Sequence, residues 1–165
     1  MCLLCPPQKV VGGRYGEDNS VGLSLTMERL GFKLGRLTTA TPPRIEKSSI
    51  DFTGLEQQWG DEPPQPFNHL ASAIDPDLAK QQQCTYITYT NANTHAVIQK
   101  ALHLVPTFLG NAGKGQGPRY CPSIEGKIRR FPDRLSHRIW LEPEGIHSPL
   151  VYPNGLSTGF PPEVQ

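Results

Sequence analysis

One stretch of the chain combines a nucleophile with the features of a helix start. It covers residues 117–131, and within it Cys121 is followed directly by Pro122. Proline suits the first position of a helix, because its missing N–H has no partner there and its φ is already helical. We therefore predict a helix from Pro122, with Cys121 at or beside the N-cap. A thiol near free backbone N–H groups and near Arg119 would have a lowered pKa and would be reactive.

The same helix start predicts a second kind of chemistry. Free N–H groups and the positive end of the helix dipole form an anion site that suits phosphate or pyrophosphate. The alternative is purely structural, since most cysteines are small buried hydrophobes and most helices that begin with proline are only helices. The residue types alone leave both interpretations open.

Charge is concentrated around this stretch. The chain has a formal net charge of +1, but the segment 114–138 holds seven basic and two acidic residues, and the rest of the chain carries a net negative charge. A basic segment beside a reactive loop suits a phosphate-bearing partner, either a dinucleotide or RNA. A solvated helix face is the structural alternative.

Composition limits the class of protein. The 165 residues suffice for one domain, and the 16 glycines and 17 prolines predict a loop-rich chain. Hydrophobic residues make up 36% and the mean hydropathy is −0.42, which indicates a thin core or a piece of something larger. No apolar run is long enough for a membrane span, and no signal peptide is visible. Cys2 and Cys5 form a single CxxC without a second pair, so we predict no metal site and a reducing compartment.

Periodicity and capping residues predict short helices and strands in a mixed order. A serine at position 20 precedes an apolar pattern, a capping box occupies 53–56, and alternation marks two strands. The expected helices cover 20–30, 53–59 and a segment from 91–94 to 102; the expected strands cover 32–37, 85–90 and 136–142; turns are expected at 143–145 and 152–155. The predicted fold class is α/β, with α+β character in its central part.

The stretch 117–131 resembles the signature of the GidA/MnmG family, the FAD-dependent tRNA uridine 5-carboxymethylaminomethyl modification enzymes. Its residues are Gly117, Pro118, Arg119, Tyr120, Cys121, Pro122, Ser123, Ile124, Glu125, Gly126, Lys127, Ile128, Arg129, Arg130 and Phe131. The loop 38–44 is similar to a loop near the flavin in that family, but Thr38 stands for an expected lysine and Ala40 for a glycine. Tyr89 likewise replaces a histidine. The resemblance covers residues 12–165.

The resemblance implies a reaction and its residues. The family installs an aminomethyl-type group, of carboxymethylaminomethyl or taurinomethyl type, at carbon 5 of the tRNA wobble uridine. FAD is its cofactor and NAD(H) reduces the flavin. By resemblance, Cys121 is a catalytic cysteine that adds to the uracil ring or handles the transferred carbon, and 117–131 is the NAD-binding stretch. Ser20 would contact FAD, and Thr39, Thr41 and Arg44 would belong to the flavin loop.

The resemblance also implies partners and a domain organisation. The expected partners are tRNA, a GTPase of the MnmE type and a second copy of the chain, and the expected location is the mitochondrion, with the cytoplasm as the alternative. Residues 1–11 read as an unrelated leader or a mistaken start. Residues 12–165 read as a fragment of a Rossmann-like FAD-binding domain with its inserted NAD-binding-like domain, and they contain no GxGxxG turn. A truncated fragment without turnover, or a dinucleotide- or RNA-binding module, remains the alternative function.

Overall fold

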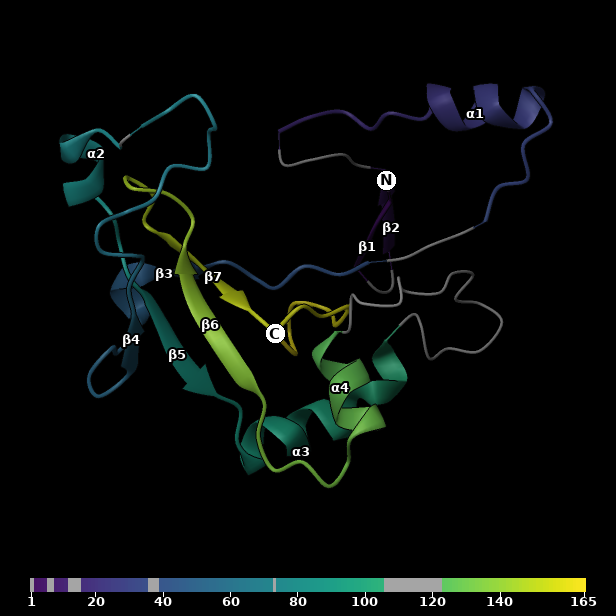
Figure 1. The fold of residues 1–165 in the computed structure, drawn as a ribbon. Coiled ribbons are helices and arrows are strands. Elements are labelled where there is room, and N and C mark those ends of the chain that lie inside the picture. Colours follow the sequence, from purple (N-terminus) through teal and green to yellow (C-terminus); the bar gives the residue numbers. More distant parts are fainter. Residues whose placement is uncertain (1, 6–7, 12–15, 36–38, 73, 106–122) are drawn as a thin grey trace. The chain divides into compact units, whose positions relative to one another are not determined.

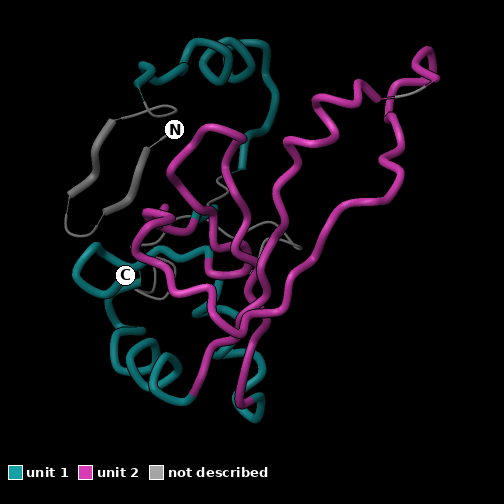
Figure 2. Tube along the Cα trace, turned by 90° about the vertical axis from the view of Figure 1, so that its left-hand side faces the viewer, with its two compact units in different colours: residues 1–41, 92–134, 157–165 teal, residues 42–91, 135–156 magenta. Residues whose placement is uncertain are grey.

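The computed structural model describes residues 2–5, 8–11, 16–35, 39–72, 74–105 and 123–165 (Figure 1). The chain divides into two compact units (Figure 2). The first unit contains residues 1–41, 92–134 and 157–165, and the second contains 42–91 and 135–156. The chain therefore leaves the first unit and returns to it twice, and each unit is described below by itself.

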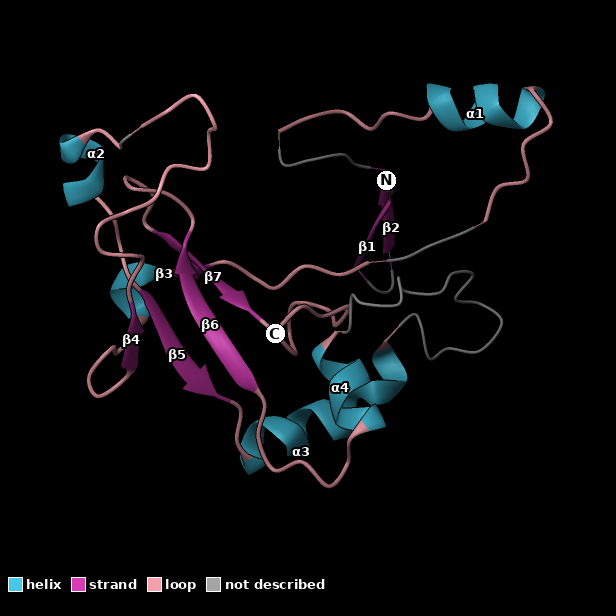
Figure 3. Cartoon of the chain, in the orientation of Figure 1, coloured by secondary structure: helices cyan, strands magenta, loops and turns pink. Residues whose placement is uncertain are grey.

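The second unit is built on a five-stranded antiparallel sheet (Figure 3). Its strand order is β3-β7-β6-β5-β4. The bounds are β3 Ile45–Glu46, β4 Glu56–Gln58, β5 Thr85–Tyr89, β6 Arg138–Pro143 and β7 Leu150–Asn154. The 3-10 turn η1 (Lys47–Ser49) follows β3, and the short helix α2 (Pro76–Lys80) lies between β4 and β5. Helices and strands thus occur together, which confirms the predicted mixed α/β class.

One face of the sheet carries the core of this unit. Leu141 pairs with Tyr86 on one side and with Pro153 on the other. Because side chains alternate along a strand, Ile139 and Leu141 of β6 point to the same face. They form a buried cluster with Val151, against which partly buried neighbours such as Phe52 and Tyr86 pack. The Phe52 and Tyr86 rings lie 4.4 Å apart between centroids.

The opposite face carries a different set of side chains. Trp140 pairs with Ile87 on β5 and with Asn154 on β7, and Gln58 of β4 pairs with Thr85. Residues in register on neighbouring strands share a face. Four strands therefore place Trp140 and several polar side chains on the side of the sheet that faces away from the core cluster, together with Ile87, which is buried there.

The first unit is mainly helical. The helix α3 (Ala92–Ala101) continues into the 3-10 turn η2 (Leu102–Leu104) and contacts α4 (Ile124–Arg130). The buried side chains of α3 are His95, Ile98 and Ala101, and those of α4 include Ile124 and Ile128. The helix α1 (Gly22–Arg29) has no buried residue, and β1 (Cys2–Cys5) pairs with β2 (Gln8–Val11) as a hairpin. Across the described ranges, no helix is long and apolar enough to cross a bilayer.

Several predicted elements are confirmed and others are wrong. The strands at 85–90 and 136–142 and the helix after residue 91 are present as β5, β6 and α3. The capping box at 53–56 does not start a helix, because residues 56–58 pair with the edge of β5 as β4. Tertiary pairing overrides a local signal of this kind. Residues 32–35 are irregular rather than a strand, and 36–37 lie outside the described residues.

Two predicted boundaries also differ. Residues 152–154 belong to β7, and the turn comes at Gly155, whose φ of 105° suits glycine. The first helix has Val21 as its N-cap, without a side-chain hydrogen bond, so Ser20 precedes the cap instead of providing it.

The core cluster predicts the effect of a truncation. Leu141→Ala should lower the free energy of unfolding of the second unit by about 2–5 kcal/mol, because a buried leucine leaves a cavity when it is truncated. Leu135→Ala is the control, since Leu135 is 84% exposed and should change stability by less than about 0.5 kcal/mol. Tryptophan fluorescence in a urea titration measures both variants. If both variants lost the same free energy of unfolding, the assignment of Leu141 to the core would be contradicted.

Candidate functional site

The structure describes the second half of the signature. Cys121 and the rest of 117–122 lie outside the described residues, so their predicted roles stay predictions. The helix α4 begins at Ile124, and Ser123 is its N-cap, with an extended backbone (φ −68°, ψ 162°). The Gly126 N–H donates to the Ser123 Oγ at 3.2 Å. The prediction that Pro122 starts the helix is therefore wrong by two residues, because the serine hydroxyl supplies the cap.

The backbone donors at the start of α4 are largely used within the protein. The Ile124 N–H donates to the Ser157 carbonyl at 2.8 Å, and the Lys127 N–H donates to the Ser123 carbonyl at 2.9 Å. The last of these is the ordinary bond of the helix ladder, so two of the donors otherwise free at the helix start, the Ile124 and Gly126 N–H groups, have internal acceptors. The helix start is thus closed by residue 157, which sequence periodicity does not reveal, and it is a poorer anion cradle than predicted.

Glu125 is the most buried acidic side chain described. It is 1% exposed, and its Oε1 accepts a hydrogen bond from the Gly159 N–H at 3.0 Å. Within the described residues, no hydrogen-bond partner faces its Oε2. A buried carboxyl group needs partners to offset desolvation, so the bond to Gly159 ties α4 to the segment 157–160. Sequence reasoning included Glu125 in the signature but gave it no role of its own.

Three basic side chains lie in the second half of α4. Lys127 is half-buried, and burial lowers its pKa. Arg129 and Arg130 are exposed in the last turn, where positive charge also interacts favourably with the helix dipole. Together with the buried Glu125, they make α4 a helix with an anchored start and a basic end.

Arg44 is fixed by three different contacts in the second unit. Its Nη1 donates to the Pro42 carbonyl at 2.8 Å, and its Nε forms an ion pair with Glu144. Its guanidinium lies over the Tyr152 ring, 4.4 Å from the centroid. These contacts join the loop 39–44 to β7 and to the turn between β6 and β7. The side chain is thus held in one place, as a binding residue must be.

The remaining predicted residues lie in the first unit. Ser20, Thr39 and Thr41 are exposed, and Thr41 forms an isolated bridge with Thr158. Because Arg44 belongs to the other unit, the structure does not assemble these four residues into one described site.

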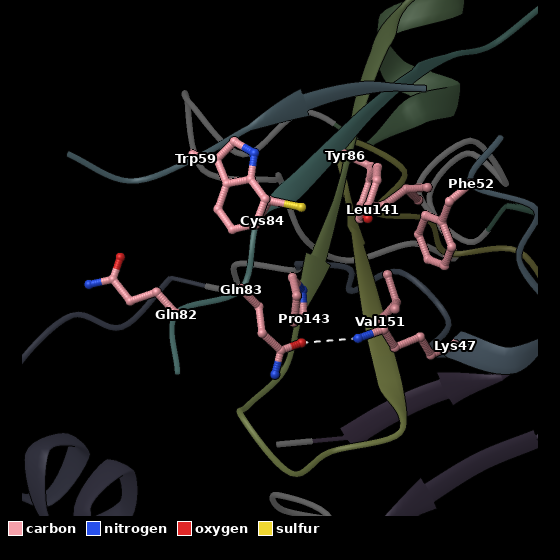
Figure 4. Close-up of a pocket in the computed structure, with 10 residues that line it drawn as sticks. All are labelled: Lys47, Phe52, Trp59, Gln82, Gln83, Cys84, Tyr86, Leu141, Pro143 and Val151. Carbon is pink, nitrogen blue, oxygen red and sulfur yellow. Dashed lines mark hydrogen bonds between the residues drawn. The ribbon is translucent and has the colours of Figure 1, made fainter. Parts of the chain in front are cut away.

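A pocket of about 240 Å³ lies on the core face of the sheet (Figure 4). Cys84 is buried in its wall, and a hydrogen bond from the Tyr86 hydroxyl to the Cys84 sulfur raises the pKa of Tyr86, because the phenol must keep its proton to donate it. At its rim, Lys47 Nζ donates to Gln83 Oε1 at 3.1 Å, the bond drawn in Figure 4. Most of the lining consists of core side chains, so we interpret this pocket as an edge of the core. Sequence reasoning missed Cys84 because a single cysteine in a strand has no distinguishing pattern.

A larger pocket of about 460 Å³ shares three lining residues with the first, namely Trp59, Gln82 and Gln83. The others are Gln58, Gly60, Thr85, Trp140, Glu142 and Asn154. Sequence reasoning missed this pocket as well, because its lining comes from four separate parts of the chain. As for metals, no group of three His, Cys, Asp or Glu side chains within the described ranges could hold an ion.

Comparison with known proteins shows to which family this chain is related. The sequence profile of the family described as "Glucose inhibited division protein A" matches residues 2–165. The chain belongs to this GidA family. The resemblance of the stretch 117–131 is thereby confirmed, and the division of the chain at residue 11 stays a prediction.

Relatives of known name support the same assignment. The chain is 49% identical over 154 residues to the tRNA uridine 5-carboxymethylaminomethyl modification enzyme MnmG of Buchnera aphidicola, covering 93% of this chain and 24% of that protein. It is 49% identical over 158 residues to the enzyme of the same name from Syntrophotalea carbinolica, covering 96% and 25%. The solved structure of Aquifex aeolicus GidA matches 99% of this chain and 28% of its own, with a TM-score of 0.82 and 43% identity. The chain thus spans about a quarter of the length of these relatives.

The capping contact at α4 predicts a local effect. Ser123→Ala should remove the acceptor of the Gly126 N–H and cost about 1 kcal/mol of helix stability. Amide hydrogen exchange should then accelerate at Gly126, whereas Ser123→Thr, which keeps a hydroxyl, should retain most of the protection. Unchanged exchange in the alanine variant would contradict the cap.

Proposed function

We propose that this chain forms part of an enzyme that modifies carbon 5 of the wobble uridine in tRNA. The observation that carries the proposal is the 49% identity, over 93% of the chain, to an enzyme named for tRNA uridine modification. The modification is of the carboxymethylaminomethyl or taurinomethyl type.

Cys121 is the proposed nucleophile. A thiolate adds readily to an electron-poor ring such as uracil. The chain enters a fixed helix two residues after Cys121, because Ser123 caps α4 and the Ile124 N–H is bound by Ser157.

FAD is the proposed cofactor, and it supplies redox chemistry when bound. The proposed contacts with FAD come from Ser20 and from Thr39, Thr41 and Arg44 of the flavin loop, and Arg44 is held in place by its contacts with Glu144 and Tyr152. NAD(H) is proposed as the reductant, held by the stretch 117–131. The cationic end of α4 supports this role, because pyrophosphate is a dianion at neutral pH.

Partners and location complete the proposal. The proposed partners are tRNA, a GTPase of the MnmE type and a second copy of the full-length protein. The basic segment 114–138 supports binding to RNA. The mitochondrion is the proposed location, because residues 130–135 look more like mitochondrial members of the family than bacterial ones.

A second candidate is a binding module without turnover. It is favoured by Thr38 and Ala40 in the flavin loop, which stand for a lysine and a glycine of the family. A polypeptide of these 165 residues should therefore retain no flavin after incubation with FAD and gel filtration, as read from the visible absorption spectrum. Stoichiometric bound flavin would contradict this expectation and would favour the complete enzyme function for the chain itself.

A chimera tests the proposed function directly. In the chimera, residues 1–165 of this chain replace the matching quarter of a bacterial relative. We expect the chimera to restore wobble-uridine modification in a strain that lacks the bacterial enzyme. Cys121→Ser should reduce the modified nucleoside at least about 100-fold, because the hydroxyl is a far weaker nucleophile. Cys84→Ser is the matched control and should keep most activity. Nucleoside mass spectrometry gives the readout, and full activity of the Cys121 variant would contradict the assignment.

A further inference from the structure

Both tryptophans of the chain line the pocket on the outer face of the sheet. The sequence contains two, Trp59 and Trp140, and each contributes to the wall of the 460 Å³ pocket. Trp59 is 62% exposed, although an indole of this size is usually much more buried. Its Nε1 donates to Gln57 Oε1 at 3.2 Å, which restricts rotation of the ring. Trp140 therefore presents its ring on the outer face, whereas Trp59 lies at the edge of the sheet and lines both this pocket and the smaller pocket on the core face.

Polar side chains surround these two rings. Four neighbouring strands contribute to the wall, because Gln58 pairs with Thr85 and Trp140 pairs with Asn154. The Asn154 Nδ2 donates to the Glu142 Oε1 at 2.8 Å, which orients both groups. A carboxamide has a second N–H and a carbonyl oxygen, so Asn154 can still donate one hydrogen bond to a ligand and accept another from it. The pocket thus combines flat surfaces with amide groups at their edges.

At one point of the rim, a glycine makes room for the side chain of Gln82. A Cβ built on Gly60 would lie 2.8 Å from the Gln82 Oε1. The carboxamide of Gln82 therefore occupies the space that a side chain at position 60 would take. Since Gln82 is flexible and exposed, a methyl group at Gly60 would displace this carboxamide within the pocket without unfolding the sheet.

A cation lies next to the aromatic wall. The Arg138 guanidinium is 5.8 Å from the Trp140 ring centroid and 5.7 Å from that of Tyr89, and its Nε donates to the Tyr89 hydroxyl at 3.2 Å. Arg138 is two residues before Trp140 on β6, so both side chains are on the outer face. An exposed guanidinium beside a stacking surface suits a phosphate that follows a stacked base.

We propose that this pocket binds an unpaired nucleotide of RNA, with the base against the tryptophans and a neighbouring phosphate near Arg138. Single-stranded RNA is recognised by bases stacked on aromatic side chains and hydrogen-bonded at their edges. Antiparallel sheets that expose aromatic and arginine side chains are suited to this task. The inference rests on the proposed function for its partner, and it adds a second RNA contact that the signature residues do not provide.

Intrinsic fluorescence tests the pocket directly, since every tryptophan of the chain lies in it. The 165-residue chain is titrated with a short oligouridylate, a base-paired RNA of equal length and NADH. The oligouridylate should quench the emission in a saturable way, and the duplex should bind more weakly because its bases are stacked within the helix. Quenching by NADH but not by the oligouridylate would overturn the proposal and assign the pocket to a dinucleotide.

Three variants separate the pocket from other RNA contacts, with binding measured by the anisotropy of a labelled oligouridylate. Trp59→Ala should weaken binding about tenfold, the loss expected for one stacked base. Gly60→Ala should weaken it at unchanged thermal stability, which guards against a folding artefact. Phe67→Ala is the control, because Phe67 is fully exposed and outside the pocket. Binding that is absent from the start, or equal in all variants, would overturn the proposal.

Failure of the proposed RNA pocket can be distinguished from failure of the proposed tRNA-modifying function. A chimera that modifies tRNA, combined with no quenching, would overturn the pocket and leave the function in place. Quenching that depends on Trp59 and Gly60, combined with an inactive chimera, would reject the enzymatic function and support the RNA site.

Discussion

The antiparallel pairing of β6 with β5 and β7 is the constraint on which the second unit depends. The register Tyr86–Leu141–Pro153 places apolar side chains on one face and thereby puts Trp140, Glu142 and Asn154 on the other. A shift by one residue would exchange the two faces, exposing the core cluster and burying the polar set. Burial of Leu141 and Val151 therefore fixes the position of the outer pocket, although these residues never touch it.

In the first unit, the segment after β7 has a comparable role. Residues 157–160 meet the start of α4 through Ser157 and Gly159, one bound to the Ile124 N–H and the other to the Glu125 carboxylate. The signature stretch is therefore anchored by residues more than thirty positions away. The glutamate of the signature holds the helix, whereas the proposed chemistry belongs to Cys121.

Local patterns were a reliable guide where they agreed with long-range pairing. Alternation at 85–90 predicted β5, and the apolar spacing after residue 91 predicted α3. The capping box at 53–56 failed because the edge of β5 offers backbone partners that a local helix signal cannot represent. The proline pattern predicts a helix from Pro122, but the Ser123 hydroxyl caps α4 and the helix begins at Ile124. Neither the bond between Glu125 and Gly159 nor the pocket around Trp59 and Trp140 could be predicted, because each joins residues distant in sequence.

The family signature could be recognised from sequence, while the geometry of the outer face could not. Together they describe a chain that belongs to a tRNA-modifying family and carries a separate surface with the chemistry of base recognition. The most direct test is hydrogen–deuterium exchange on this chain, with and without an anticodon stem-loop that has uridine at the wobble position. The account predicts slower exchange in residues 56–60, 82–85 and 138–142 upon addition of the RNA. Unchanged exchange in all three segments at saturating RNA would contradict it.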